Sequence, residues 1–336
     1  MGKGCGIAII GGSGTVGKEL AAALLKSERI RIGQLKLFSS VASAGEQFYI
    51  ADKPFKLQLL PKDPLEGDLF DDIDIVCLAT PASVSQRLLP IFAEEGMVVV
   101  DIGGGFSERL PLAAFQIDEQ EEFFAEERLV ATPSAPAMIV GQLLWPLRSR
   151  GLIGARVQFS LGASYAGKHG VEELSKQIGA LYNYRDPPRK IFPEGLAFDM
   201  ISTVGSIQED GSTDREQYVR RELASLLSIS IDQLDVGMQY VPLFSGLVAQ
   251  LHVRMEQDLE KEELEEILRG LPSVVLGVKP VGPKRLLGMD SIHVGRLRPD
   301  GLGDGFHLWV SADNVIAGAV RNIVSLIEHY IERDLL

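Results

Sequence analysis

Apolar residues in the first half of the chain fall in short runs that alternate with a helical pattern. The runs cover residues 6–10, 34–38, 74–79 and 97–101, and residues 16–25 have the spacing of an amphipathic helix. Runs without polar alternation are typical of strands that are buried on both faces. Strands that alternate with helices predict an α/β fold, with an N-terminal Rossmann-like, doubly wound sheet.

The middle of the chain mixes polar and apolar positions within its predicted strands, residues 157–161, 239–243 and 251–255. This pattern favours a sheet with one covered face, and therefore a second, α+β domain. Helices are expected over residues 171–181, 215–227 and 256–268, with a loop over residues 182–193.

A last helix is predicted within residues 313–330, because its apolar side chains recur on one face: Val320, Ile323, Val324, Ile327 and Ile331. We expect this helix to return to the first domain. The predicted domains are therefore residues 1–132 with 313–336, and residues 133–312.

The net charge and the cysteine count indicate which binding partners and which cellular compartment the chain suits. A formal net charge of −13 argues against nucleic acid or an anionic membrane as the main partner. Only two cysteines are present, Cys5 and Cys77, which suits a reducing compartment, and both are expected to be small core residues. The sequence has neither a membrane-spanning apolar run nor a signal-peptide pattern, so we expect a cytoplasmic protein.

A glycine-rich loop follows the first predicted strand and opens the first predicted helix. Gly11, Gly14 and Gly17 form a GxxGxxG pattern, with Thr15 and Val16 in the first helical turn. In this context the pattern predicts a dinucleotide site: Gly11 permits a tight turn, Gly14 lets a pyrophosphate approach the backbone, and Gly17 lets the helix pack closely. The alternative is a close-packed turn without a ligand.

The end of the second strand does not identify the nucleotide. An acidic residue that would hold a ribose hydroxyl is absent, and Ser39 and Ser40 stand there instead. No arginine follows in residues 41–45, so the preference between NAD and NADP stays open.

Other candidate groups have simpler structural interpretations. Ser134, before Ala135 and Pro136, is expected to cap a helix rather than to act as a nucleophile. Residues 103–105, a run of glycines, are either an anion-binding backbone nest or a permissive turn. No two of the five histidines have metal-ligand spacing, so no metal is expected, and His169 is either part of a turn or a ligand contact.

Seven segments together resemble the aspartate-semialdehyde dehydrogenase family over nearly the whole chain. They are residues 11–17 (GGSGTVG), 39–48 (SSVASAGEQF), 98–106 (VVVDIGGGF), 130–147 (VATPSAPAMIVGQLLWPL), 164–174 (SYAGKHGVEEL), 240–246 (YVPLFSG) and 309–319 (WVSADNVIAGA). The resemblance implies NAD or NADP as cofactor, a homodimer formed by the second domain, and a relation to amino-acid biosynthesis.

Family chemistry uses a cysteine thiolate that attacks an acyl phosphate or aldehyde, with a histidine as its acid–base partner. By the resemblance, the cysteine position is Ala135 and the histidine position is Leu247. The positions of substrate-binding arginine and lysine are Tyr240 and Tyr218, although the acidic Glu216 remains. Ser107 stands at the position of the family's phosphate-binding arginine, and Arg109 lies two residues further on. The family's glutamine position falls near Gly162 or Ala163.

These combined losses resemble the degenerate, Usg-type members of the family. We therefore expect a pseudoenzyme whose NAD(P) binding is weakened or lost. The first alternative is an oxidoreductase that acts on an aldehyde or oxo group without a cysteine, with Tyr218, Tyr240 or His169 as acid or base. The second is an interaction or regulatory subunit with a further protein partner.

Overall fold

The computed structural model describes residues 4–50, 53–105, 108–115, 117, 127–256, 259–301, 305–333 and 335. The chain divides into two compact units. Unit 1 comprises Met1–Ser134 and Ala319–Leu336, and unit 2 comprises Ala135–Gly318. No helix within the described ranges is long and apolar enough to cross a membrane.

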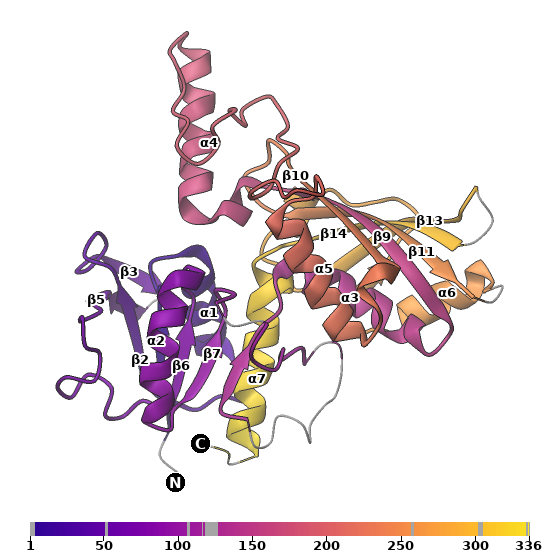
Figure 1. Cartoon of the computed structure of the whole chain (residues 1–336). Coiled ribbons are helices and arrows are strands. Elements are labelled where there is room, and N and C mark those ends of the chain that lie inside the picture. Colours follow the sequence, from indigo (N-terminus) through magenta and orange to yellow (C-terminus); the bar gives the residue numbers. More distant parts are fainter. Residues whose placement is uncertain are drawn as a thin grey trace. The chain divides into compact units, whose positions relative to one another are not determined.

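Unit 1 contains a parallel six-stranded sheet, drawn in indigo and purple in Figure 1. The strands occur in the order β5 (Gln58–Leu59), β2 (Ile32–Ser39), β1 (Cys5–Ile10), β6 (Ile75–Leu78), β7 (Val98–Asp101) and β8 (Leu129–Ala131). The chain passes from the β2 side to the β6 side at β1, so the carboxyl ends of β1 and β6 form the position where this architecture binds ligands.

Both faces of the parallel sheet are covered. Helix α2 (Ala82–Glu94) buries Leu88 and Phe92 against strand residues such as Ile10. The side chains of Ile7 and Ile9 point to the opposite face of the sheet from that of Ile10, and they are fully buried as well. The continuous apolar runs in the sequence follow from this double burial, and the predicted doubly wound fold is confirmed.

Two further helices and a hairpin-like pair complete unit 1. Helices α1 (Thr15–Lys26) and α7 (Arg321–Glu332) contact each other, and Arg29 beyond α1 pairs with Glu328 at 3.0 Å. The last helix therefore packs within the first unit. Strands β3 (Gln47–Ile50) and β4 (Lys53–Lys56) pair in antiparallel fashion.

Unit 2 is built on a mixed six-stranded sheet. Its strands occur in the order β10 (Leu234–Tyr240), β9 (Leu152–Leu161), β11 (Leu247–Met255), β14 (Gly305–Ala312), β13 (Ile292–Pro299) and β12 (Val274–Leu276). Pairs β10–β9 and β12–β13 are parallel, and the other neighbours are antiparallel.

One face of this mixed sheet is buried and the other carries polar side chains. Helices α3 (Ala135–Arg148) and α5 (Asp214–Leu227) pack against each other and against β9 and β10 (Figure 1). Side chains that alternate with the buried ones, such as Arg156, Gln250 and Arg254, are exposed. The strands of the sequence mix polar and apolar residues because successive side chains point alternately to the buried and the exposed face of this sheet.

Helix α4 (Gly167–Tyr182) is fastened to the irregular segment that follows it by two buried polar side chains. The Glu173 carboxylate accepts hydrogen bonds from three successive backbone N–H groups, of Lys190, Ile191 and Phe192. Gln177 accepts from Leu196 and Ala197. These bonds hold residues 190–197 against helix α4, although the sequence predicts only a loop over residues 182–193.

Three predicted elements are misplaced. The strand expected at residues 239–243 ends at Tyr240, because Pro242 has no N–H to continue the ladder. The helix expected from residue 256 is α6 (Lys261–Arg269), which begins after Glu260; residues 257–258 lie outside the described ranges. The last helix is preceded by a π-helical turn, Ile316–Val320, since Asp313 bonds the N–H groups of Val315 and Ile316.

Candidate functional site

The glycine loop makes its turn at the carboxyl end of β1. Gly11 has φ of +92°, and a β-carbon there would lie 2.1 Å from the Ala79 carbonyl oxygen at the end of β6. The N–H groups of Gly11 and Gly12 both donate to the carbonyl oxygen of Phe38, at 3.0 and 2.9 Å. These two donors are therefore committed to the protein, and backbone donors for an anion must come from the start of α1.

Helix α1 offers such donors. It begins at Thr15, and its N-cap, Gly14, supplies no side-chain cap. The N–H groups of the first helical turn, which includes Thr15, Val16 and Gly17, have no partner within the helix itself. A β-carbon at Gly17 would lie 2.4 Å from the Gly11 oxygen, so Gly17 is needed for close packing of the helix on the turn rather than on the strand.

Gly14 is the least constrained of the three glycines. The nearest atom to a β-carbon there is the Gly11 oxygen, at 3.3 Å. A β-carbon would therefore need the Gly11 carbonyl group to shift by a few tenths of an ångström, so packing constrains Gly14 less than Gly11 or Gly17. A second reason for glycine here, the close approach of a phosphate, stays a prediction.

The two serines after β2 differ in accessibility. Ser39 is buried and donates to the Ser40 carbonyl oxygen at 3.3 Å, whereas Ser40 is exposed. Of the pair, Ser40 is the one whose hydroxyl could reach a ribose.

The three glycines after β7 are explained by close packing on the loop after β6. A β-carbon at Gly103 would lie 1.8 Å from the Thr80 oxygen, and one at Gly105 would lie 2.8 Å from the Ala82 oxygen. Gly104 has φ of +73°. The Gly103 N–H donates to the buried Asp101 at 3.1 Å. This geometry accounts for a permissive turn, and an anion nest stays a prediction.

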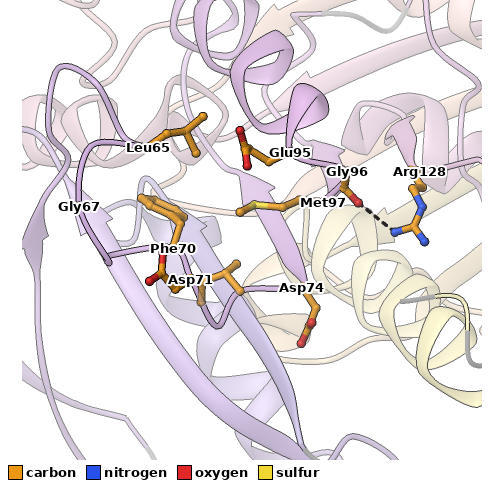
Figure 2. A pocket seen from close by; sticks show the side chains of 10 residues that line it. Leu65, Gly67, Phe70, Asp71, Asp74, Glu95, Gly96, Met97 and Arg128 are labelled. Carbon is orange, nitrogen blue, oxygen red and sulfur yellow. Dashed lines mark hydrogen bonds between the residues drawn. The ribbon is translucent and has the colours of Figure 1, made fainter.

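A cavity of about 480 Å³ lies at the opposite, amino-terminal edge of this sheet (Figure 2). Its lining includes the carboxylates of Asp71, Asp74 and Glu95, and Arg128, whose guanidinium donates to the Gly96 oxygen. Asp74 also accepts from the Gly6 N–H. An acidic cavity at the amino ends of the strands is unsuited to an anionic nucleotide, so the glycine-loop edge stays the candidate nucleotide site of this sheet.

In unit 2, Ala135 is the first residue of α3. Its β-carbon lies 2.5 Å from where a Gly318 β-carbon would be, so Gly318 lets the π-helical turn pass close to the start of α3. Ser134 immediately precedes the helix, which is the location predicted for its cap. The methyl group of Ala135 has no nucleophilic character.

Leu247 is the first residue of β11 and is fully buried. It lies opposite Leu161 on β9 and Ala312 on β14. The preceding Gly246 has φ of +98° and donates to Asn314 at 3.0 Å. At this position the chain therefore packs an aliphatic side chain into the sheet core.

Tyr240 belongs to an aromatic cluster at the end of β10. Its ring centroid lies 5.2 Å from that of Phe192 and 6.3 Å from that of Tyr165. Burial raises the pKa of the Tyr240 hydroxyl to about 12, although the nearby Arg215 guanidinium opposes that shift. Burial raises the pKa of Tyr165 too. Both phenols keep their protons at neutral pH, so neither can serve as a general base there.

Glu216 is engaged in backbone contacts. One carboxylate oxygen accepts from the Thr213 N–H at 2.7 Å, which completes a capping box at the start of α5. The other accepts from the Met238 N–H on β10 at 2.8 Å. The neighbouring Tyr218 ring lies 6.0 Å from the Arg215 guanidinium carbon. A substrate role for Glu216, Tyr218 and Tyr240 stays a prediction.

A buried polar network beside these residues was missed by sequence reasoning. The Ser245 hydroxyl donates to Ser164 at 3.0 Å, and Ser164 donates to the Asn314 side-chain oxygen at 2.9 Å. The segment at Gly162 and Ala163 pairs with the segment before Leu247. Ser164, Ser245 and Asn314 come from three distant parts of the chain, so no local spacing could have indicated this network.

The remaining candidate residues either lie away from this network or fall outside the residues that the structure describes. His169 is exposed on the first turn of α4 and lies 3.4 Å from Glu172. Cys5 and Cys77 are buried, as expected, and burial raises the pKa of each thiol to about 12. Ser107 lies outside the described residues, and Arg109 is exposed.

Comparison with known proteins identifies both parts of the chain. Residues 6–119 match the NAD binding domain of semialdehyde dehydrogenases, and residues 144–317 match their dimerisation domain. The chain belongs to the semialdehyde dehydrogenase family.

Individual members of this family align with the chain end to end. It is 28% identical to an aspartate-semialdehyde dehydrogenase of Rickettsia bellii, over 100% of both chains. It is also 28% identical to a USG-1 protein homolog of Azotobacter vinelandii, over 97% of this chain and 98% of that one. The structure is similar to aspartate semialdehyde dehydrogenase II of Vibrio cholerae complexed with ASA, with a TM-score of 0.89, 25% identity, and coverage of 98% and 99%.

Within the semialdehyde dehydrogenase family, the glycine loop of this chain lies in the matched NAD binding domain. Leu247 lies in the matched dimerisation domain, whereas Ala135 lies between the two matched segments. The predicted family and two-domain architecture are thereby confirmed.

Proposed function

We propose that this chain is a homodimeric, non-catalytic relative of aspartate-semialdehyde dehydrogenase whose backbone scaffold for a nicotinamide nucleotide persists. Burial of Leu247 carries the proposal, because this aliphatic side chain fills the core where the family places its acid–base histidine. An alanine at position 135 supports the same conclusion, since a thioester cannot form on a methyl group.

Retention of the nucleotide scaffold is supported by the steric design of the loop. Gly11 and Gly17 occupy positions that no β-carbon could share, and α1 starts with a glycine cap. The homodimer is supported by the match to the family's dimerisation domain. We also propose a cytoplasmic location, which the low cysteine content supports.

The first test is an activity assay of the purified chain with aspartate semialdehyde, phosphate and NADP or NAD. We expect no turnover above that of the uncatalysed mixture. Turnover that Ser134→Ala abolishes would contradict the proposal, because Ser134 would then be the nucleophile. Reduction of an aldehyde by NADPH that is lost in Tyr240→Phe would favour an oxidoreductase that works without cysteine.

Calorimetric titration with NAD, NADH, NADP and NADPH tests the nucleotide site separately. We expect binding of at least one nucleotide, and roughly tenfold or greater weakening in Gly14→Ala, where a methyl group would meet the pyrophosphate. Gly179→Ala is the matched control, because nothing lies within 4 Å of its β-carbon. No binding of any nucleotide would remove this part of the proposal, and recovery of a heterodimer would turn attention to a regulatory subunit.

A further inference from the structure

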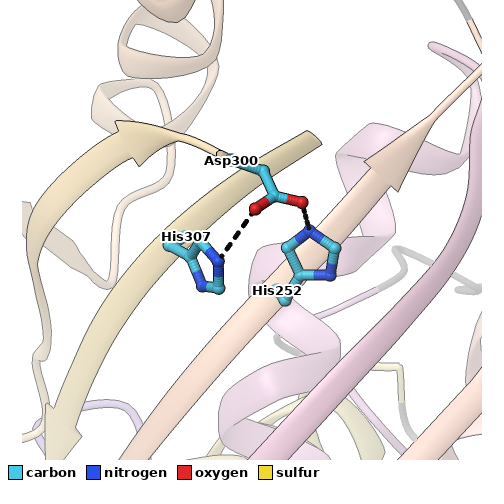
Figure 3. Close-up of side chains that lie close together, drawn as sticks. All are labelled: His252, Asp300 and His307. Atoms are coloured by element: carbon cyan, nitrogen blue, oxygen red, sulfur yellow. Dashed lines mark hydrogen bonds and ion pairs between the residues drawn. The ribbon is translucent and has the colours of Figure 1, made fainter. Parts of the chain in front are cut away.

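Two histidines and an aspartate meet on the polar face of the unit 2 sheet. His252 on β11 lies directly opposite His307 on β14 in the antiparallel ladder. Asp300 follows β13 and precedes β14. Figure 3 shows the Asp300 carboxylate between the two imidazole rings. None of these residues belongs to the glycine loop or to the positions of the family's cysteine and histidine.

The three side chains converge closely. The His252 Nε2 atom lies 2.7 Å from Asp300 Oδ2, and the His307 Nε2 atom lies 3.3 Å from Asp300 Oδ1. The ring centroids are 4.7 Å apart, and one ligand atom from each residue lies within 4.8 Å of the others. Ligand atoms around a tetrahedral zinc ion, at bond lengths near 2.1 Å, are about 3.4 Å apart. Small side-chain movements would therefore admit an ion.

The backbone holds these ligands in place before any ion arrives. Both histidines are fixed on paired strands, and the Asp300 N–H donates to the oxygen of Gly305, the first residue of β14, at 2.7 Å. The Asp300 side chain is only 6% exposed, whereas His307 is 39% exposed. The carboxylate is thus buried while one side of the cluster stays open to an incoming ion and a water ligand.

We propose that His252, Asp300 and His307 form a binding site for a divalent transition-metal ion, with Zn²⁺ as the best match. Two imidazole nitrogens and one carboxylate are a ligand set of zinc sites that keep a fourth position for water. Calcium and magnesium prefer all-oxygen sites, so they fit less well.

The surrounding charges are partly neutralised. Arg156, opposite His252 on β9, pairs with Asp235 at 2.7 Å. Arg298, opposite His307 on β13, is exposed and opposes a cation from the rim. The competing interpretation is a hydrogen-bonded triad that only fastens β11 and β14 to Asp300, the residue that follows β13.

Metal titration of the full chain, after treatment with a chelator, decides between these interpretations. Co²⁺ is added first, because its visible absorption reports coordination by nitrogen and oxygen ligands, and Zn²⁺ is then used to displace it. We expect one ion per chain and at least roughly tenfold weaker binding in each of His252→Ala, His307→Ala and Asp300→Asn. His293→Ala, on β13 of the same sheet, and His169→Ala should bind like the unaltered chain.

Two results would overturn the site. One is failure of the unaltered protein to bind Zn²⁺ or Co²⁺ at millimolar concentration, which does not depend on any variant folding. The other is binding that survives all three substitutions but is lost in His293→Ala or His169→Ala. Circular dichroism of each variant verifies that a loss of binding is not a loss of fold.

Discussion

The glycine-loop edge of unit 1 and the family's catalytic positions in unit 2 differ in what they retain. At the loop, Gly11 and Gly17 still occupy places that exclude any side chain. At the positions that the resemblance aligns with the family's catalytic residues, Ala135 begins α3 and Leu247 begins β11, and neither side chain can act as a nucleophile or a base. Under the proposed function, the steric requirements of the fold have outlasted the chemistry, because only the former contribute to folding.

The largest expected effect comes from breaking the loop itself. In Gly11→Ala the new β-carbon meets the Ala79 oxygen at 2.1 Å with φ of +92°. We expect the free energy of unfolding to fall by about 3 kcal/mol or more. Urea unfolding followed by circular dichroism measures this.

Gly14→Ala is the matched comparison within the same loop. Its nearest contact is at 3.3 Å, and the position is an N-cap that lacks a side-chain bond. A loss below about 1 kcal/mol is expected. Equal losses in the two variants would show that the loop is not under the steric constraint described.

A smaller effect is expected from Glu173→Gln in unit 2. Burial raises the pKa of this carboxyl, but the N–H donors of Phe192, Ile191 and Lys190 outweigh burial, so its pKa lies below the ordinary value. The charged Glu173 carboxylate therefore stabilises the folded state fully above the ordinary pKa of a glutamate. This stabilisation is lost as the pH falls through the lowered pKa of Glu173.

We expect Glu173→Gln to cost about 2 kcal/mol near neutral pH, where the charged hydrogen bonds are lost. It should also speed proteolysis of residues 183–213. Glu172→Gln, in the same helix with a side chain that is 41% exposed, is the control. Equal rates of cleavage in both variants would refute the role given to Glu173.

The smallest effect concerns the thiols. Burial raises the pKa of Cys5 and Cys77 to about 12, so neither forms a thiolate at pH 8. We expect no reaction with a thiol reagent in the native protein and reaction of both residues after denaturation. Rapid labelling of the native chain would mean that a thiol is accessible after all.

The parallel sheet was predictable because its signals are local. Strands β1, β6 and β7 are short apolar runs, and the glycine pattern follows β1 directly. The same local signals misplaced β10, since residues 241 and 243 are apolar but Pro242 interrupts the ladder.

Clusters assembled by strand pairing were not predictable in this way. His252 and His307 are far apart in sequence and become neighbours only through the β11–β14 register, so the expectation of no metal, which rested on local spacing, could not detect them. The network of Ser164, Ser245 and Asn314 escaped for the same reason.

The two hydrogen bonds of Glu216 bear on how relatives of this chain should be interpreted. Its carboxylate caps α5 and fastens that helix to β10, so the residue has a mechanical task that is independent of any substrate. A glutamate at this position would be maintained by selection for a folded subunit even after turnover had ceased. Under the proposed function, positions 135 and 247 would therefore separate active from inactive members of the family, whereas position 216 would not.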